Sequence, residues 1–231
     1  IMDDANFWMS FWVSVKRVFF GTIFSMLAII MMSYPLSKSN KVFKARNFFM
    51  WALIFCMLFN GGTIPWFITV KNYHLLDNFW ALVFAGSLPV FNVILVINFY
   101  KNLPAELEEA AKVDGAGPWR TLWQIIVPCS VPVLATIVLF TSVGYWNEYF
   151  QGLVLMNKAE NYPLQTYIRQ IVVQIPAGVT LTAEQYQLMN QNSNKSLDAA
   201  KVFIAMIPML MVYPFLQKYF VTGITLGAVK E

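Results

Sequence analysis

Long apolar runs without charged residues alternate with short charged segments along this 231-residue chain. The charge-free runs cover residues 18–37, 47–70, 78–100, 121–147 and 202–217. A helix needs about 20 mostly apolar residues to cross the hydrocarbon core of a bilayer, and four of the runs reach that length. The fifth is shorter, but Lys218 can snorkel to the interface and extend the span to about residue 221. The pattern predicts an all-α membrane protein with five transmembrane helices.

The composition agrees with this prediction. Hydrophobic residues make up 58% of the chain and charged residues 12%, against about 25% charged residues in soluble domains. A large buried helical core is the alternative, but runs of this length leave little chain to surround one. The mild net charge of +4 does not indicate a nucleic-acid-binding protein. Cys56 and Cys129 lie within apolar runs, which predicts buried free thiols rather than a disulfide framework.

The basic residues predict how the chain is oriented in the membrane. Residues 38–46 contain four basic residues and no acidic one, which is typical of a cytoplasmic loop. Five spans then place the N-terminus outside, the loop at 101–120 and the C-terminus inside, and the long loop at 148–201 outside. An outside N-terminus without a signal-like start predicts a further span upstream, and therefore six in the native protein. The whole chain, 1–231, is interpreted as one transmembrane domain.

Residues 101–120 are the most conspicuous segment between two runs, because they concentrate charge and turn-forming residues. Pro104 suits the first turn of a helix, and Glu106 lies where the helix dipole favours an acid. We expect this helix to run to about Asp114 and to end at Gly115, which can adopt the left-handed conformation. Such a short helix is unstable on its own, so a partner should hold it.

Helical spacing groups several residues of this segment. Four of them recur at three- and four-residue intervals and are expected on one face: Leu107, Ala110, Ala111 and Asp114. The two alanines would permit close approach by another surface. Glu109 has a simpler explanation as a solvated side chain or a partner of Lys112, three residues on. Asp114 could equally be a local acceptor at the helix end.

One pattern extends from this loop into the next run: Glu109-Ala-Ala, then Gly115, Ile125 and Val127-Pro128. It resembles the signature of permease subunits of binding-protein-dependent ABC importers, which reads EAA, three residues, G, nine residues, I-x-L-P. Val127 stands where leucine is usual, a mild change of shape. The tripeptide alone would be weak evidence. The full pattern, on the predicted inside between two spans, is specific.

Further stretches are similar to carbohydrate importers of the maltose-transporter type. Gly144-Tyr-Trp-Asn-Glu-Tyr149 resembles their W-N-x-F/Y stretch, and Gly223–Lys230 resembles their C-terminal tail, with Leu226 and Glu231 as departures. Residues 59–65 and 162–165 resemble a branch associated with oligosaccharide and polysaccharide-derived substrates. The resemblance covers about residues 10–230.

The resemblance implies a bacterial cytoplasmic (inner) membrane location and a set of partners. These are a second permease subunit in a heterodimer, two ATPase subunits and an extracytoplasmic substrate-binding protein. The short helix around 106–114 would be the coupling helix. It would contact an ATPase subunit through Glu106, Glu109, Ala110, Ala111, Asp114 and Gly115. The tail would reach the ATPase through Thr225, Gly227 and Lys230. ATP and Mg²⁺ would bind the ATPase, because this chain has no Walker-type motif, and no cofactor of its own is expected.

Polar and aromatic residues at membrane depth are the candidates for the substrate pathway: Asn60, Asn92, Tyr145, Trp146, Asn147 and Tyr149. Each has a structural alternative, since amides also hydrogen-bond between helices and aromatic residues form a belt at the membrane boundary. His74 is the only histidine and lies in a short loop, so neither a catalytic nor a metal site is predicted. Prolines within the runs are expected to kink helices around a cavity.

These residues bear on four candidate functions. The resemblance favours the permease of an ATP-driven sugar importer, most specifically for an oligosaccharide. An ABC permease for a non-sugar solute shares the coupling loop and stays open as an alternative. A secondary transporter usually has ionisable residues within its spans for ion coupling, and the charge-free runs have none. A membrane-embedded enzyme would need a catalytic constellation that is not visible.

Overall fold

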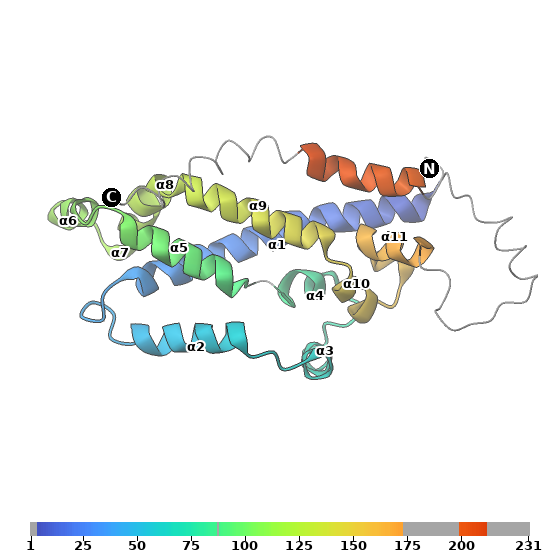
Figure 1. Cartoon of the computed structure of the whole chain (residues 1–231), viewed down its shortest axis with the longest axis horizontal. Helices are drawn as coiled ribbons and strands as arrows, with labels where there is room; N and C mark the ends of the chain where they lie inside the picture. Colours follow the sequence, from blue (N-terminus) through green and yellow to red (C-terminus); the bar gives the residue numbers. More distant parts are fainter. Residues whose placement is uncertain (1–3, 87, 173–198, 212–231) are drawn as a thin grey trace, which may run out of the picture.

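The structure is a computed structural model that describes residues 4–86, 88–172 and 199–211, and every regular element within these ranges is helical (Figure 1). The first helices are α1 (Ala5–Ser37), α2 (Arg46–Leu58), α3 (Thr63–Asn72), α4 (Phe79–Phe84) and α5 (Val90–Asn102). They are followed by α6 (Glu106–Val113), α7 (Pro118–Thr121), a π-helical turn (Leu122–Ile126), α8 (Val127–Cys129) and α9 (Val131–Asn147). The remainder comprises α10 (Phe150–Leu155), a 3-10 turn (Ala159–Asn161), α11 (Leu164–Val172) and a last helix at Ala199–Met211. The predicted all-α class is confirmed for these residues.

Helix α1 is the axis of the bundle and packs along α5 and α9 (Figure 1). Small residues on α1 permit close approach: the ring of Tyr145 on α9 lies over Gly21, where an added Cβ would be 2.6 Å from its Cζ atom. Ser33 donates a hydrogen bond to the Val93 carbonyl of α5 at 3.2 Å. Because lipid is as apolar as a leucine side chain, such close packing and hydrogen bonding hold membrane helices together.

The apolar runs do not all form single straight helices. The run at 18–37 lies within α1, but that helix begins at Ala5 and so also contains Lys16 and Arg17. The run at 47–70 is divided into α2 and α3, which meet at 116°, and the run at 78–100 is divided into α4 and α5. The run at 121–147 bends by 82° between α8 and α9.

Glycine and proline account for these interruptions. Gly62 at the end of the α2–α3 break has φ +88°, a backbone conformation that residues other than glycine rarely adopt. Pro89 directly precedes α5, and Pro128 and Pro132 flank the bend at Ser130. A proline inside a helix removes one backbone hydrogen bond and clashes with the preceding turn. The expectation that prolines interrupt the helices is therefore met at these positions.

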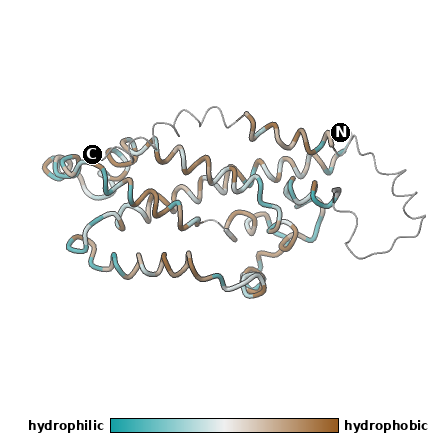
Figure 2. The backbone as a smooth tube through the Cα atoms, viewed as in Figure 1, coloured by the Kyte–Doolittle hydropathy of each residue, from teal (hydrophilic) through white to brown (hydrophobic). Residues whose placement is uncertain are grey.

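Among the described helices, α1 alone is long and apolar enough to cross a membrane unaided. Up to three spans result if each of the two bent pairs counts as one. The helix at Ala199–Met211 is apolar but shorter, and it covers only part of the predicted span at 202–221. Hydrophobic colour follows α2 and α9, whereas the α6 end of the molecule is largely hydrophilic (Figure 2). Five spans and their orientation stay predictions.

The first part of the predicted outer loop, 148–201, is helical and covers the N-terminal half of α1. The backbone N–H of Leu164, at the start of α11, donates to the Ser14 hydroxyl of α1 at 2.8 Å. Asp77 joins the short loop before α4 to this region, because its carboxylate accepts hydrogen bonds from the backbone of Asn157 and the amide of Asn161. Residues 173–198 lie outside the described part of the chain.

Candidate functional site

The predicted short helix is present as α6, at one end of the bundle (Figure 1). It ends at Val113, and Gly115 follows in the left-handed conformation with φ +73°. The N–H of Ala116 donates to the Ala111 carbonyl at 2.8 Å, and the N–H of Gly115 donates to the Lys112 carbonyl at 3.0 Å. These two bonds define a Schellman motif, which satisfies carbonyls at the helix end. The predicted termination at Gly115 is confirmed.

The residues predicted to share one face of α6 differ in their exposure. Ala111 is only 3% exposed because it faces the bundle, and Leu107 is half-buried. Ala110 and Asp114 are exposed. The side of α6 that is free to receive a partner is formed by Glu106, Glu109, Ala110, Val113 and Asp114. Ala111 therefore seats the helix on its own chain, while Ala110 lies on the open side.

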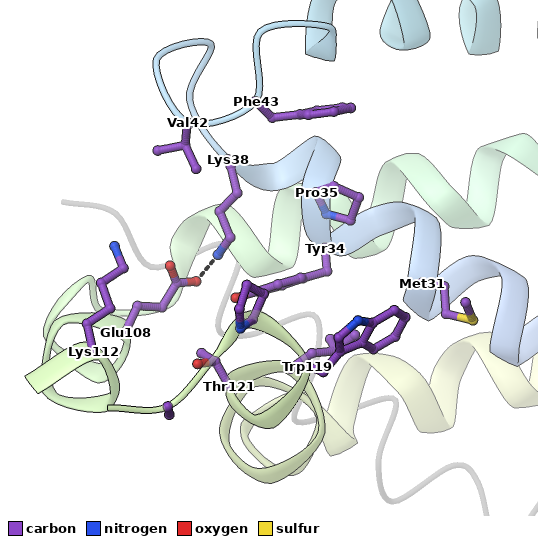
Figure 3. A pocket seen from close by; sticks show the side chains of 13 residues that line it. Met31, Tyr34, Pro35, Lys38, Val42, Phe43, Glu108, Lys112, Trp119 and Thr121 are labelled. Atoms are coloured by element: carbon purple, nitrogen blue, oxygen red, sulfur yellow. Dashed lines mark hydrogen bonds and ion pairs between the residues drawn. The ribbon is translucent and has the colours of Figure 1, made fainter. Parts of the chain in front are cut away.

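An ion pair between Lys38 and Glu108 attaches α6 to the end of α1 (Figure 3). The Lys38 ammonium also lies 4.1 Å from the centre of the Tyr34 ring. Burial lowers the pKa of Lys38, and the hydrogen bond to Glu108 opposes that shift. The pair was missed by sequence reasoning because its members are 70 residues apart.

Beside this ion pair is a cavity of about 460 Å³ between the end of α1, the loop after it and the start of α7. Figure 3 shows Tyr34, Trp119 and Phe43 around it, with Lys38 and Glu108 at one side. The π-helical turn Leu122–Ile126 follows directly on α7. Such turns are rare and frequently lie at functional sites. Helix α6 is thus connected to α1 through the ion pair and to α9 through α7, this turn and α8.

Three of the substrate-pathway candidates are engaged in hydrogen bonds between helices. The amide of Asn92 donates to the Thr141 hydroxyl at 3.3 Å, and the Tyr145 hydroxyl donates to the Val83 carbonyl at 3.0 Å. The Trp146 indole N–H donates to the Ala205 carbonyl at 3.1 Å. All three side chains are buried. Their positions support the structural alternative, although Asn92 and Tyr145 also line a small cavity of about 150 Å³.

The other three candidates are more accessible but do not lie together. Asn60 is exposed at the α2–α3 break and lines an open cavity of about 620 Å³. Asn147 is exposed at the end of α9. Tyr149 is half-buried, with the Arg169 guanidinium 4.3 Å from its ring centre. The six candidates therefore do not form one site.

A buried charged cluster that sequence reasoning missed lies between the two cavities. Arg17 of α1 is 1% exposed and donates to the Leu82 carbonyl, the Glu148 carbonyl and the Glu148 carboxylate, at 3.0, 3.0 and 2.9 Å. It also donates to the side-chain oxygen of Gln151. Glu148 and Gln151 line both the small cavity of about 150 Å³ and the open cavity of about 620 Å³. Arg17 lies one residue before the charge-free run at 18–37, and α1 includes it because the helix begins at Ala5, ahead of that run.

Two further predictions concern thiols and the tail. Cys56 and Cys129 are free, but both are exposed in this chain, so their predicted burial is wrong. Cys56 is exposed because α2 buries only Leu53 against the bundle.

The tail residues Thr225, Gly227 and Lys230 lie outside the described residues. Within the described ranges, no group of three His, Cys, Asp or Glu residues could hold a metal ion.

Comparison with known proteins places these features in context. Residues 7–226 match the family described as "Binding-protein-dependent transport system inner membrane component". Protein LplC of Bacillus subtilis is 39% identical over 230 residues, which cover 100% of this chain and 77% of that protein. The polygalacturonan/rhamnogalacturonan transport system permease protein YtcP of the same organism is 38% identical over 218 residues, or 94% and 75% of the two chains.

A solved structure is also similar. It is the crystal structure of a bacterial ABC transporter involved in the import of the acidic polysaccharide alginate. One of its chains is 33% identical to this chain, with a TM-score of 0.84 over 95% of this chain and 77% of that one. The bent and broken helices described above therefore occur within an architecture shared with a solved importer.

Proposed function

This chain belongs to the family of binding-protein-dependent transport system inner membrane components, and from that membership we propose how it moves its substrate. It is the permease component of an ATP-driven sugar importer, a membrane component rather than an ATPase. Membership of this family implies partners such as a second permease, an ATPase and a substrate-binding protein.

The proposed substrate is an oligosaccharide released from a larger polysaccharide. Support comes from YtcP, named for polygalacturonan and rhamnogalacturonan transport, and from the alginate importer. Both substrates are polymers, and both matches cover more than nine-tenths of this chain. A non-sugar solute is the second candidate, since the coupling loop itself does not distinguish substrates.

In the proposed orientation the chain crosses the membrane five times, with its N-terminus outside and α6 in the cytoplasm. The open side of α6, which includes Glu106, Glu109 and Ala110, lodges in a groove of one ATPase subunit. The tail residues Thr225, Gly227 and Lys230 contact the ATPase as well. ATP and Mg²⁺ bind the two ATPase subunits, and a second, different permease completes the pathway.

The observation that carries the coupling proposal is the fixed geometry of α6. The Schellman motif at Gly115 ends the helix in one conformation, buried Ala111 seats it on the bundle, and Glu108 ties it to Lys38. A helix held in this way transmits displacement instead of absorbing it. Closure of the ATPase pair would then tilt α1 and the α7–α9 segment together and change which side of the membrane the pathway faces.

The test is reconstitution of the complete transporter with its second permease, ATPase and binding protein. Uptake of labelled oligosaccharide should require ATP, and sugar-loaded binding protein should stimulate ATP hydrolysis. Stimulation by loaded peptide or amino-acid binding proteins but by no sugar would favour the second candidate. Uptake that continues without ATP and collapses with an ionophore would instead indicate secondary transport.

A further inference from the structure

The α2–α3 break places irregular backbone within the membrane. In the proposed orientation α2 starts at the inner boundary, and its 13 residues rise about 20 Å at 1.5 Å per residue. The hydrocarbon core is about 30 Å thick, so Phe59–Gly62 lies inside it. Non-helical backbone at that depth is tolerated only where it is buried in protein or lines a water-filled cavity. In this chain these residues are exposed and adjoin the open cavity.

The open cavity of about 620 Å³ is lined from two sides, and each side carries both aromatic and polar side chains. On the α2–α3 side it is lined by Cys56, Asn60, Thr63, Trp66 and Thr69. On the other side it is lined by Glu148, Phe150 and Gln151. The rings of Trp66 and Phe150 are stacked, with centroids 6.4 Å apart and planes at 27°. Flat aromatic faces beside amide, hydroxyl and carboxylate groups suit a sugar ring, which has apolar faces and a hydroxyl-bearing edge.

Arg17 holds Glu148 and Gln151, the polar wall of the cavity, in place. Its guanidinium donates to the Glu148 carboxylate and to the Gln151 side-chain oxygen. The other Glu148 carboxylate oxygen accepts the Gln151 backbone N–H at 2.9 Å. The positive charge of Arg17 also cancels the charge of Glu148, and these are the only Asp, Glu, Lys or Arg side chains lining either cavity among the described residues. The wall therefore offers hydrogen bonds without a net charge that would repel an acidic sugar.

We propose that this cavity is an oligosaccharide subsite of the translocation pathway. The cavity-facing side of the stacked Trp66–Phe150 pair contacts a sugar ring, Asn60, Glu148 and Gln151 hydrogen-bond to its hydroxyl-bearing edge, and Arg17 is the positioning residue for Glu148 and Gln151. This assignment rests on the proposed sugar import and names where in this chain the sugar binds.

Cys56 makes the subsite testable without altering its wall. In a Cys129→Ser transporter in lipid nanodiscs, Cys56 is the only thiol of this chain, and it should react with a charged, water-soluble thiol reagent. Binding protein loaded with an oligogalacturonide mixture, or with whichever oligosaccharide stimulates the ATPase, should slow that reaction several-fold relative to sugar-free binding protein. The matched control is Cys129 in a Cys56→Ser transporter, whose rate should not change.

Substitutions give the second measurement. Gln151→Ala and Trp66→Ala should raise the KM for uptake by roughly 2- to 12-fold, the range expected for one lost interaction, while the ATP consumed per sugar stays unchanged. Trp66→Phe should restore part of the loss, and Phe48→Ala, an exposed aromatic residue outside the cavity, should have no effect. Arg17→Lys should raise KM as Gln151→Ala does, and the double variant should be no worse than either.

The outcomes separate the two proposals. If no sugar stimulates the ATPase, the proposed function fails and the subsite fails with it. If a sugar stimulates the ATPase but Cys56 is unreactive, or reacts at the same rate with and without sugar, the cavity is covered or unused and the subsite alone is overturned. Additive effects of Arg17→Lys and Gln151→Ala would overturn the positioning role of Arg17.

Discussion

Two ion pairs attach α1 to the rest of the chain, one within the helix and one just after its C-terminal end. Within the helix, the Arg17 side chain is 1% exposed and Glu148 28%, and the guanidinium donates to four acceptors, two of them backbone carbonyls. Towards α6, Lys38 and Glu108 are 17% and 24% exposed, and Lys38 has one carboxylate and an aromatic face. The first attachment consists of several bonds from a buried guanidinium, whereas the second is a single ion pair that is supplemented by buried Ala111 and the turn at Gly115.

This difference bears on the stability of the two attachments. A buried pair becomes strongly destabilising when one partner is lost, by about 3–5 kcal/mol, because the other charge stays behind uncompensated. A solvent-exposed pair contributes about 0.2–1 kcal/mol, and the Lys38–Glu108 pair, 17% and 24% exposed, lies between these two limits. Loss of Arg17 should therefore cost more stability than loss of Lys38, because α6 is also held by buried Ala111 and by the turn at Gly115.

The largest effect is expected from Arg17→Met. It leaves the Glu148 carboxylate partly buried without its cation and should lower the free energy of unfolding by about 3–5 kcal/mol. Arg17→Met/Glu148→Met removes both charges and should recover much of that loss. Thermal unfolding of the purified transporter measures both variants. A double variant no more stable than the single one would show that the pair is not the source of the effect.

The two alanines of α6 should separate seating from coupling. Ala111→Leu overfills a buried position and should destabilise the permease by about 1–3 kcal/mol even without its ATPase. Ala110→Leu should leave the isolated permease unchanged but lower the uptake obtained per ATP. Unfolding of the permease and coupled uptake by the complex provide the two measurements. Equal effects of both substitutions on the isolated permease would contradict the assignment.

Gly115→Val tests the turn that ends α6. A β-branched residue in the left-handed conformation should cost about 1–2 kcal/mol, and an added Cβ would meet nothing within 4 Å, so the penalty comes from the backbone alone. We expect ATP hydrolysis to continue while uptake falls. Gly115→Asn is the control, since Asn tolerates this conformation. Full ATP-dependent uptake by the Val variant would refute a mechanical role for this turn.

Lys38→Met should lower the free energy of unfolding by less than Arg17→Met but by more than the about 0.2–1 kcal/mol of a solvent-exposed pair, because its side chain is 17% exposed. Its consequence should be larger on coupling, because α6 loses its ion pair with α1. Thermal unfolding and uptake per ATP, measured side by side in the variant and the parent, check this. A loss of stability as large as that of Arg17→Met would remove the distinction between the two attachments.

The last prediction concerns Asp4, which forms an ion pair with Lys201 at the N-terminal end of α1. Burial raises the pKa of Asp4, but hydrogen bonds from Lys201, Tyr167 and the Phe7 N–H outweigh it and lower the pKa from 3.8 to about 2. The stabilisation is present above about pH 4 and is lost as pH falls towards 2. Thermal unfolding between pH 5 and 2 should show a steeper loss in the parent than in Asp4→Asn.

Local features were predictable and distant ones were not. The end of α6 at Gly115 depends on neighbouring residues, so its sequence was enough to predict it. The Lys38–Glu108 and Arg17–Glu148 pairs join residues that are 70 and 131 positions apart. In the sequence, Lys38 and Arg17 are visible only as basic residues next to an apolar run, and nothing there indicates their partners. The break within 47–70 had a visible cause in Gly61-Gly62, but charge-free length was given more weight.

The sequence by itself determined the helical class, the coupling loop and its resemblance to importer permeases, because apolar length, turn chemistry and motif spacing are all local. Only the tertiary structure decided which side of α6 is exposed and which candidate side chains already form hydrogen bonds between helices. It also decided that Arg17 lies buried inside the bundle. The physical reason is that a buried polar group must find its partner wherever the fold supplies one. That partner depends on the packing of helices far apart in the chain, which no local pattern specifies.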